Sequence, residues 1–141
     1  MEEYRWLIDN APKLPIGYCG RAQALAMLRS KKRARAALDE MISMSGDGFV
    51  SPYLVAMVHA RLGDETAAIE WLDRAAIQRD ANFICAAVDP TFAELRKRPG
   101  WIALMKKHGL GEASAIVRSA GPLELFNRSE LGPNGQRSRL D

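Results

Sequence analysis

Small and apolar residues return at helical spacing in the middle of the chain. They do so over residues 52–62 and again over residues 67–75, at every third or fourth position. Ser51, which precedes a proline, is suited to cap the start of the first segment, and Gly63 is suited to the left-handed conformation at its end. Asp64 can cap the second segment. The pattern predicts two antiparallel helices joined by a very short turn.

The same pattern occurs a second time, 34 residues earlier. Four pairs of residues coincide at this offset, namely Ala22 with Ala56, Ala34 with Ala68, Leu38 with Leu72, and Met41 with Ala75. The earlier copy predicts helices over residues 18–28 and 30–45, but Arg29 takes the place of the turn glycine. We therefore expect a similar helix pair whose turn is looser or reoriented.

The spacing and the residue types resemble the tetratricopeptide repeat (TPR) family, in which helix, turn and helix units of about 34 residues stack into a solenoid. The matching positions are Ala56, Gly63, Ala68, Leu72 and Ala75. Arg21 lies where the family usually has an apolar residue, and His59 where it often has a tyrosine. The resemblance implies an all-α, short TPR-like solenoid of antiparallel helix pairs with a C-terminal closing segment. It also implies binding rather than catalysis.

Short segments follow the second helix pair. Asp89 and Pro90 are suited to be the cap and first residue of a short helix, and Pro99 opens another. Residues 50–53 and 88–101 resemble the helix start and the closing segment in the C-terminal repeat region of a group of bacterial regulatory proteins. In that group a winged-helix, nucleotide cyclase or kinase-like domain often precedes the repeats. None of these domains is expected here, so their activities are not carried over.

The two ends of the chain differ from its middle. Residues 2–8 predict one or two amphipathic turns that cap the first helix pair. Beyond residue 110, glycines and prolines punctuate a polar segment of balanced charge. We expect a helical repeat domain over residues 1–110 and a flexible tail over residues 111–141. A short helix over residues 113–120, and docking of residues 123–126 on a groove, are alternatives for parts of this tail.

The composition fits a folded domain without a membrane segment. The 141 residues are 48% hydrophobic, which is ample for a core. No apolar run approaches the roughly 18 to 20 residues that span a membrane, and the N-terminus is acidic rather than signal-like. We expect a cytoplasmic protein. Cys19 and Cys85 form no CxxC pair, so we expect free thiols.

The formal net charge of +3 is mild, but one basic cluster is dense. It consists of Arg29, Lys31, Lys32, Arg33 and Arg35. The cluster can be an anion or nucleic-acid patch, or it can be a solvated helix face. No aromatic residues interleave with these cations, as a single-strand binding surface requires. Nucleic acid is therefore the less expected partner.

The sequence offers little for catalysis. His59 and His108 are the only histidines, and neither has a second ligand at a spacing typical of metal sites. The nucleophile, phosphate-binding and dinucleotide motifs are missing. We expect no enzymatic activity, no metal and no cofactor.

In repeats of this family the first helix of each unit lines a concave groove. By position, the resemblance implies a partner-binding groove formed by Cys19, Gln23, Met27, Tyr53, Met57 and Arg61. The methionines offer adaptable apolar contact, and Arg61 and Gln23 could hold a carboxylate or main chain. Alternatively, the chain's own ends cover the methionines. We expect a protein–protein interaction module, a scaffold or adaptor; the alternative is a nucleic-acid-associated or small-ligand-responsive regulatory protein.

Self-association is a further expectation. About three repeats are normally needed for a stable solenoid, and its outer faces need polar caps. This chain has two recognisable repeats, and the short segment before them contains the apolar Trp6 and Leu7. We expect a homodimer joined through the N-terminal end, or through a tail exchanged into the groove.

Overall fold

The computed structural model describes residues 1–43, 50–112, 114 and 115. Within these ranges the chain is helical and contains no strand, which confirms the all-α class. The α-helices are α1 (Glu2–Asn10), α2 (Pro15–Met27), α3 (Lys31–Ser43), α4 (Pro52–Leu62), α5 (Glu65–Ile77) and α6 (Pro99–Lys107). The 3₁₀ helices η2 (Ala81–Ala87), η3 (Pro90–Phe92) and η4 (Leu95–Lys97) lie between α5 and α6.

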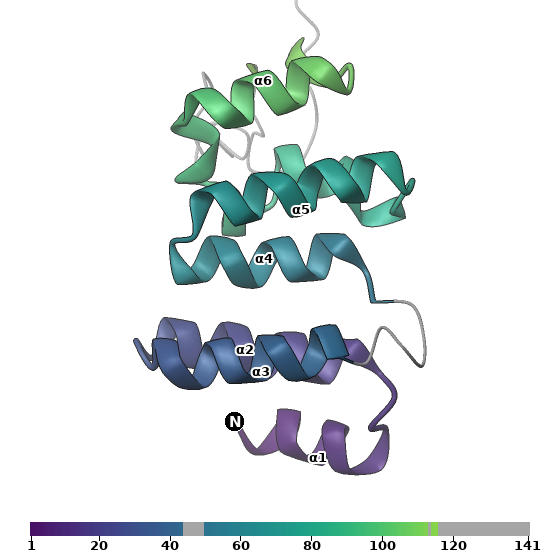
Figure 1. Cartoon of the computed structure of the whole chain (residues 1–141), viewed down its shortest axis with the longest axis vertical. Helices are drawn as coiled ribbons and strands as arrows, with labels where there is room; N and C mark the ends of the chain where they lie inside the picture. The colour runs from purple at the N-terminus through teal and green to yellow at the C-terminus, as the bar shows by residue number, and fades with distance from the viewer. Residues whose placement is uncertain (44–49, 113, 116–141) are drawn as a thin grey trace, which may run out of the picture.

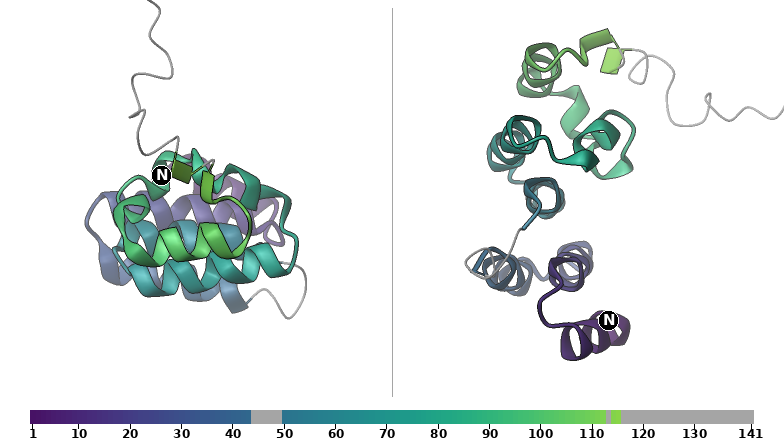
Figure 2. Two further views of the ribbon diagram at one scale, coloured as in Figure 1. Left: turned by 90° about the horizontal axis from the view of Figure 1, so that it is seen from above. Right: turned by 90° about the vertical axis from the view of Figure 1, so that its right-hand side faces the viewer.

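The helices pack as neighbouring pairs along the long axis of the molecule. α2 packs against α3 and α4 against α5, and α2 and α4 also touch each other. In Figure 1, α1 lies at one end of the stack and α6 at the other. The turned view in Figure 2 shows α2 and α3 side by side, which overlap in Figure 1. The prediction of two packed helix pairs is therefore confirmed.

Both pairs turn the chain in the same way. Gly63 has a φ of 83°, and the N–H of Asp64 donates to the carbonyl of His59 at 3.0 Å. Arg29 has a φ of 57°, and the N–H of Ser30 donates to the carbonyl of Leu25 at 2.9 Å. This is the left-handed helix end that glycine favours. The expected looser turn at Arg29 is wrong, because the helix-end hydrogen bonds hold arginine in glycine's conformation.

The predicted helix starts lie at the expected residues, but only one of the two cap side chains forms the expected hydrogen bond. The Ser51 hydroxyl caps α4 by accepting from the N–H of Leu54 at 3.3 Å. Asp64 stands at the cap position of α5, yet its side chain makes no capping bond. Its carboxylate instead pairs with Arg35 of α3 at 3.0 Å. The expected cap has thus become a link between the two helix pairs.

The residues that coincide at the 34-residue offset form the interior. All eight are at most 3% exposed. The first pair and the inner face of α4 share one apolar cluster, and the second pair shares another with the closing segment. Trp71 packs against both clusters. The small residues let the helices approach closely, so the repeat seen in the sequence is a repeat of buried positions.

The closing segment packs against the second pair as short 3₁₀ turns followed by α6. The Asp89 carboxylate caps η3 by accepting from the N–H of Thr91 at 2.8 Å, and Pro99 opens α6. Both starts were predicted. Trp101 is fully buried, and its indole N–H donates to the Ser114 hydroxyl at 2.8 Å. Ordered contacts thus continue past residue 110, whereas residue 113 and the expected tail from residue 116 lie outside the described residues.

α1 packs on α2 at the N-terminal end of the stack. A methyl group on Gly20 would meet the ring of Tyr4 at 2.2 Å, and one on Gly17 would meet Ile8 at 3.2 Å. The two glycines therefore allow a close approach of the helices. Trp6, in contrast, is 65% exposed. The expected short cap is a helix of 9 residues that leaves its tryptophan outside.

Candidate functional site

The predicted groove residues do not share one environment. Cys19 and Tyr53 are buried, at 0% and 4% exposure, so neither offers its side chain to a partner in the folded state. Met27 is 67% exposed, Arg61 is exposed, and Gln23 and Met57 are half-buried. We call the four accessible residues, Gln23, Met27, Met57 and Arg61, the α2–α4 stripe.

Cys19 joins α2 to α4. Its thiol donates to the carbonyl of Leu54 at 3.7 Å, and the Gln23 side-chain amide donates to its sulfur at 3.2 Å. Burial raises the pKa of the Cys19 thiol, and the hydrogen bond from Gln23 opposes this only in part. The protonated thiol is a packing group rather than a nucleophile.

Tyr53 holds the closing segment against α4. Its hydroxyl donates to the Asp89 carboxylate at 2.7 Å, and its ring meets that of Phe92 edge to face at 5.6 Å. Burial raises the pKa of Tyr53, and the bond to Asp89 raises it further. Arg61 reaches the same segment, because its guanidinium donates to the Thr91 hydroxyl at 3.3 Å. The chain's own closing segment therefore flanks the second-unit part of the stripe.

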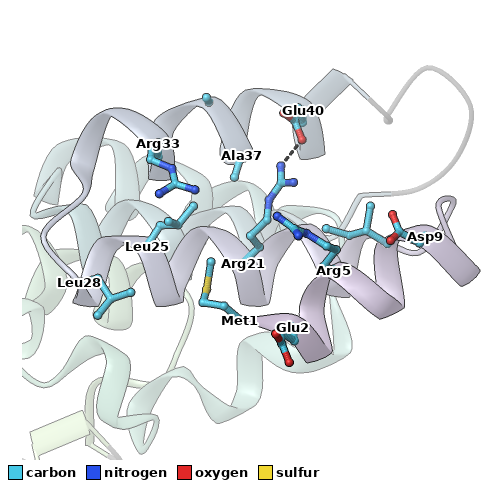
Figure 3. Close-up of a pocket in the computed structure, with 12 residues that line it drawn as sticks. Met1, Glu2, Arg5, Asp9, Arg21, Leu25, Leu28, Arg33, Ala37 and Glu40 are labelled. Carbon is cyan, nitrogen blue, oxygen red and sulfur yellow. Dashed lines mark hydrogen bonds and ion pairs between the residues drawn. The ribbon is translucent and has the colours of Figure 1, made fainter.

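A concavity lies elsewhere, between α1, α2 and α3. This N-terminal hollow has a volume of about 610 Å³. Its lining comprises Met1, Glu2, Arg5, Ile8, Asp9, Arg21, Leu25, Leu28, Arg33, Ala36, Ala37 and Glu40. Figure 3 shows the side chains of Arg5, Arg21 and Arg33 reaching into it from three different helices. Sequence reasoning missed this site, although Arg21, noted as an exception to the repeat, was a signal for it.

The cations of the hollow are unequally neutralised. Arg21 forms an ion pair with Glu40 of α3 and lies over the Tyr18 ring, 5.5 Å from its centroid. Its Nε is buried and has no hydrogen-bond partner among the described residues. Within the same ranges, Arg5 and Arg33 form no ion pair. Glu2 and Asp9 line the hollow as well. The hollow therefore combines charged side chains of both signs with the apolar side chains of Ile8, Leu25 and Leu28.

The basic cluster lies beside the hollow, at the start of α3. Arg29, Lys31, Lys32 and Arg33 are exposed, and the first turn of α3 contains no acidic residue. Only Arg35 of the cluster has an ion-pair partner in the described part of the chain, Asp64. Positive charge at a helix N-terminus opposes the helix dipole, so this turn favours a nearby anion.

The two histidines act as structural contacts. His59 is half-buried with Nδ1 3.6 Å from the Asp64 carboxylate, and burial lowers its pKa. His108 Nε2 lies 2.6 Å from the Asp73 carboxylate, which also accepts from Lys107 at 2.8 Å. The hydrogen bonds from Lys107 and His108 lower the pKa of Asp73. Across residues 1–43, 50–112, 114 and 115, no three His, Cys, Asp or Glu side chains are grouped as metal ligands.

Among the helices described here, none has the length and apolar character needed to cross a membrane. Comparison with known proteins gave no match: neither a family model, nor a curated protein, nor a solved structure is significantly similar to this chain.

Proposed function

We propose that this protein is a non-catalytic interaction module, a scaffold or adaptor of the TPR-like kind, that binds a segment of a partner protein across α2 and α4. The observation that carries the proposal is the equivalence of the two helix pairs. Their buried residues and their left-handed turns coincide at one offset of 34 residues. Stacked units of this type generally present an extended surface for binding.

The α2–α4 stripe supplies the accessible part of that surface. Met27 is exposed on α2, and Arg61 is exposed on α4 beside the closing segment. A flexible thioether and a guanidinium are suited to an apolar side chain and a carboxylate, respectively. The titratable groups nearby, Cys19, Tyr53 and His59, are engaged in contacts that hold the fold. The site thus favours binding over chemistry.

Site-specific photo-crosslinking tests this proposal. A photoreactive amino acid would replace Met27 in one variant and Arg61 in another, in cells of the source organism. Ile77 on α5, which is 65% exposed, gives the matched control. We expect positions 27 and 61 to capture the same protein and position 77 to miss it. Capture of that protein from position 77 alone would contradict the proposal.

Two further attributes belong to the proposal. We place the protein in the cytoplasm, since its sequence contains no apolar run long enough to span a membrane. We place it within a bacterial regulatory system on the strength of the sequence resemblance. We also expect a homodimer through α1, because Trp6 is 65% exposed at the end of the stack. Sedimentation equilibrium of the full chain and of Trp6→Glu checks this. A wild-type protein that stays at 15.6 kDa at all concentrations would contradict it.

A further inference from the structure

We propose that the N-terminal hollow binds a peptide segment of a partner in which acidic side chains alternate with apolar ones. The hollow lies between α1, α2 and α3, whereas the α2–α4 stripe belongs to another set of side chains. The two sites can therefore be tested separately. The inference goes beyond the proposed function by naming a second surface and the chemistry of what binds there.

Three guanidinium groups define the polar half of the site. Arg5, Arg21 and Arg33 come from three helices and extend into the same space (Figure 3). Glu40 neutralises Arg21. Glu2 and Asp9 also line the hollow, but among the described residues neither forms an ion pair with Arg5 or Arg33. The buried Nε of Arg21 keeps a free donor. Guanidinium groups bind carboxylates with paired, charge-assisted hydrogen bonds, so acidic side chains complete this arrangement.

Basic residues at the start of α3 add positive charge at the positive end of the helix dipole. At the equivalent position of the second pair, Asp64 precedes α5 and Glu65 begins it, as the helix dipole favours. In the first pair, Ser30 precedes α3 and Lys31 begins it. The positive end of α3 therefore meets further positive charge. Of the cations in the first turn of α3 only Arg33 lines the hollow, so an acidic ligand there would relieve this repulsion in part.

The apolar half of the site matches a face that is already used for docking. The second pair contacts the first through Val55, Leu62 and Trp71, which pack against the apolar cluster of the first pair. The residues 34 positions earlier are Arg21, Leu28 and Ala37, and all three line the hollow. Leu28 is 67% exposed there.

The hollow is thus the outer copy of an internal interface, which α1 covers only in part. A segment that enters it would bury Leu28 against apolar side chains of its own. Nucleic acid fits this site less well, because the lining contains no aromatic side chain on which a base could stack.

A displayed library of random dodecapeptides tests the inference on the full chain. Wild type would be compared with Arg5→Gln/Arg33→Gln, whose arginines have no ion-pair partner among the described residues and can be lost without breaking the fold. Met27→Gln/Arg61→Gln is the matched control at the α2–α4 stripe. We expect wild type and the stripe variant to select peptides rich in Asp or Glu together with Leu or Ile. The hollow variant should lose the peptides that the stripe variant still selects.

The affinity of a selected peptide for each protein then measures how much the arginines contribute to binding. We expect about a tenfold or greater loss of affinity in the hollow variant, little change in the stripe variant, and a shift of the Arg21 Nε–H resonance on binding. Identical peptide pools from wild type and the hollow variant would overturn the inference. So would enrichment lost only in the stripe variant, an oligothymidylate that competes for the hollow more tightly than the peptide, or a dimer contact that occupies it.

Discussion

The two helix pairs share their interior and differ on the face that looks toward the N-terminus. In the second pair this face carries Val55, fully buried, and Trp71, and it packs on the first pair. In the first pair the same positions carry Arg21 and Ala37, and they line a hollow. Interior positions are fixed by the partner helix of the same pair, which is always present. The residue types on the face toward the N-terminus depend on what packs against the pair from outside, so they indicate the chemistry of that neighbour.

The largest expected effect separates the two ends of the stack. Trp101→Ala removes a fully buried side chain from the closing segment and leaves the Ser114 hydroxyl without its donor. We expect a loss of about 3 to 5 kcal/mol in the free energy of unfolding. Trp6→Ala, at the exposed end of α1, should stay within about 0.5 kcal/mol of wild type when both proteins are measured as monomers at low concentration. Urea denaturation measures both, and equal losses would contradict the contrast.

Overpacking tests whether the two interiors are equivalent. Ala34 and Ala68 occupy the same position in the two pairs, and each is 0% exposed. Ala34→Leu and Ala68→Leu should each cost on the order of 1 to 3 kcal/mol, because neither site has room for three more carbons. Thermal melts of the two variants provide the measurement. If one variant melts with wild type, that helix pair does not have the register described above.

Substitutions in the two turns, Arg29→Gly and Gly63→Ala, should change the free energy of unfolding in opposite directions. Arg29→Gly relieves a left-handed arginine, so we expect a gain of about 1 kcal/mol in the free energy of unfolding. Gly63→Ala imposes the same strain, so we expect a loss of similar size, since no atom lies within 4 Å of the added methyl. Arg29→Ala is the control for the lost charged chain. Effects of the same sign in the two turns would show that they are not equivalent.

At the position shared by residues 25 and 59, acid should lower the stability of the second pair only. His59 stands where the first pair has Leu25. Burial lowers the pKa of His59, so the unfolded chain binds more protons and stability falls as the pH drops through the window below 6.5. His59→Leu should lose less stability than wild type between pH 7.5 and pH 5.5. Parallel losses in urea titrations would mean that His59 does not titrate differently on folding.

Much of the fold could be predicted because packing dictates it locally. The small residues at the 34-residue offset predict helix contacts, and they are buried. Ser51 before a proline predicts a helix start and Gly63 a left-handed helix end, and the structure has both. The binding surface was harder to predict. Whether Tyr53 faces a partner or the closing segment depends on a contact with Asp89, 36 residues away. The hollow depends on how α1 lies on Gly20, which no spacing rule encodes.

The two thiols differ in accessibility, so their alkylation rates report on the opening of the helix stack. Cys85 is exposed, whereas Cys19 is sealed between α2 and α4. An alkylating reagent should therefore add one label to the folded chain quickly and a second only when the two helix pairs separate. The delay between the two mass increments measures how often the stack opens at its central joint. A ligand bridging α2 and α4 would lengthen that delay, and one lodged beneath α1 would leave it unchanged.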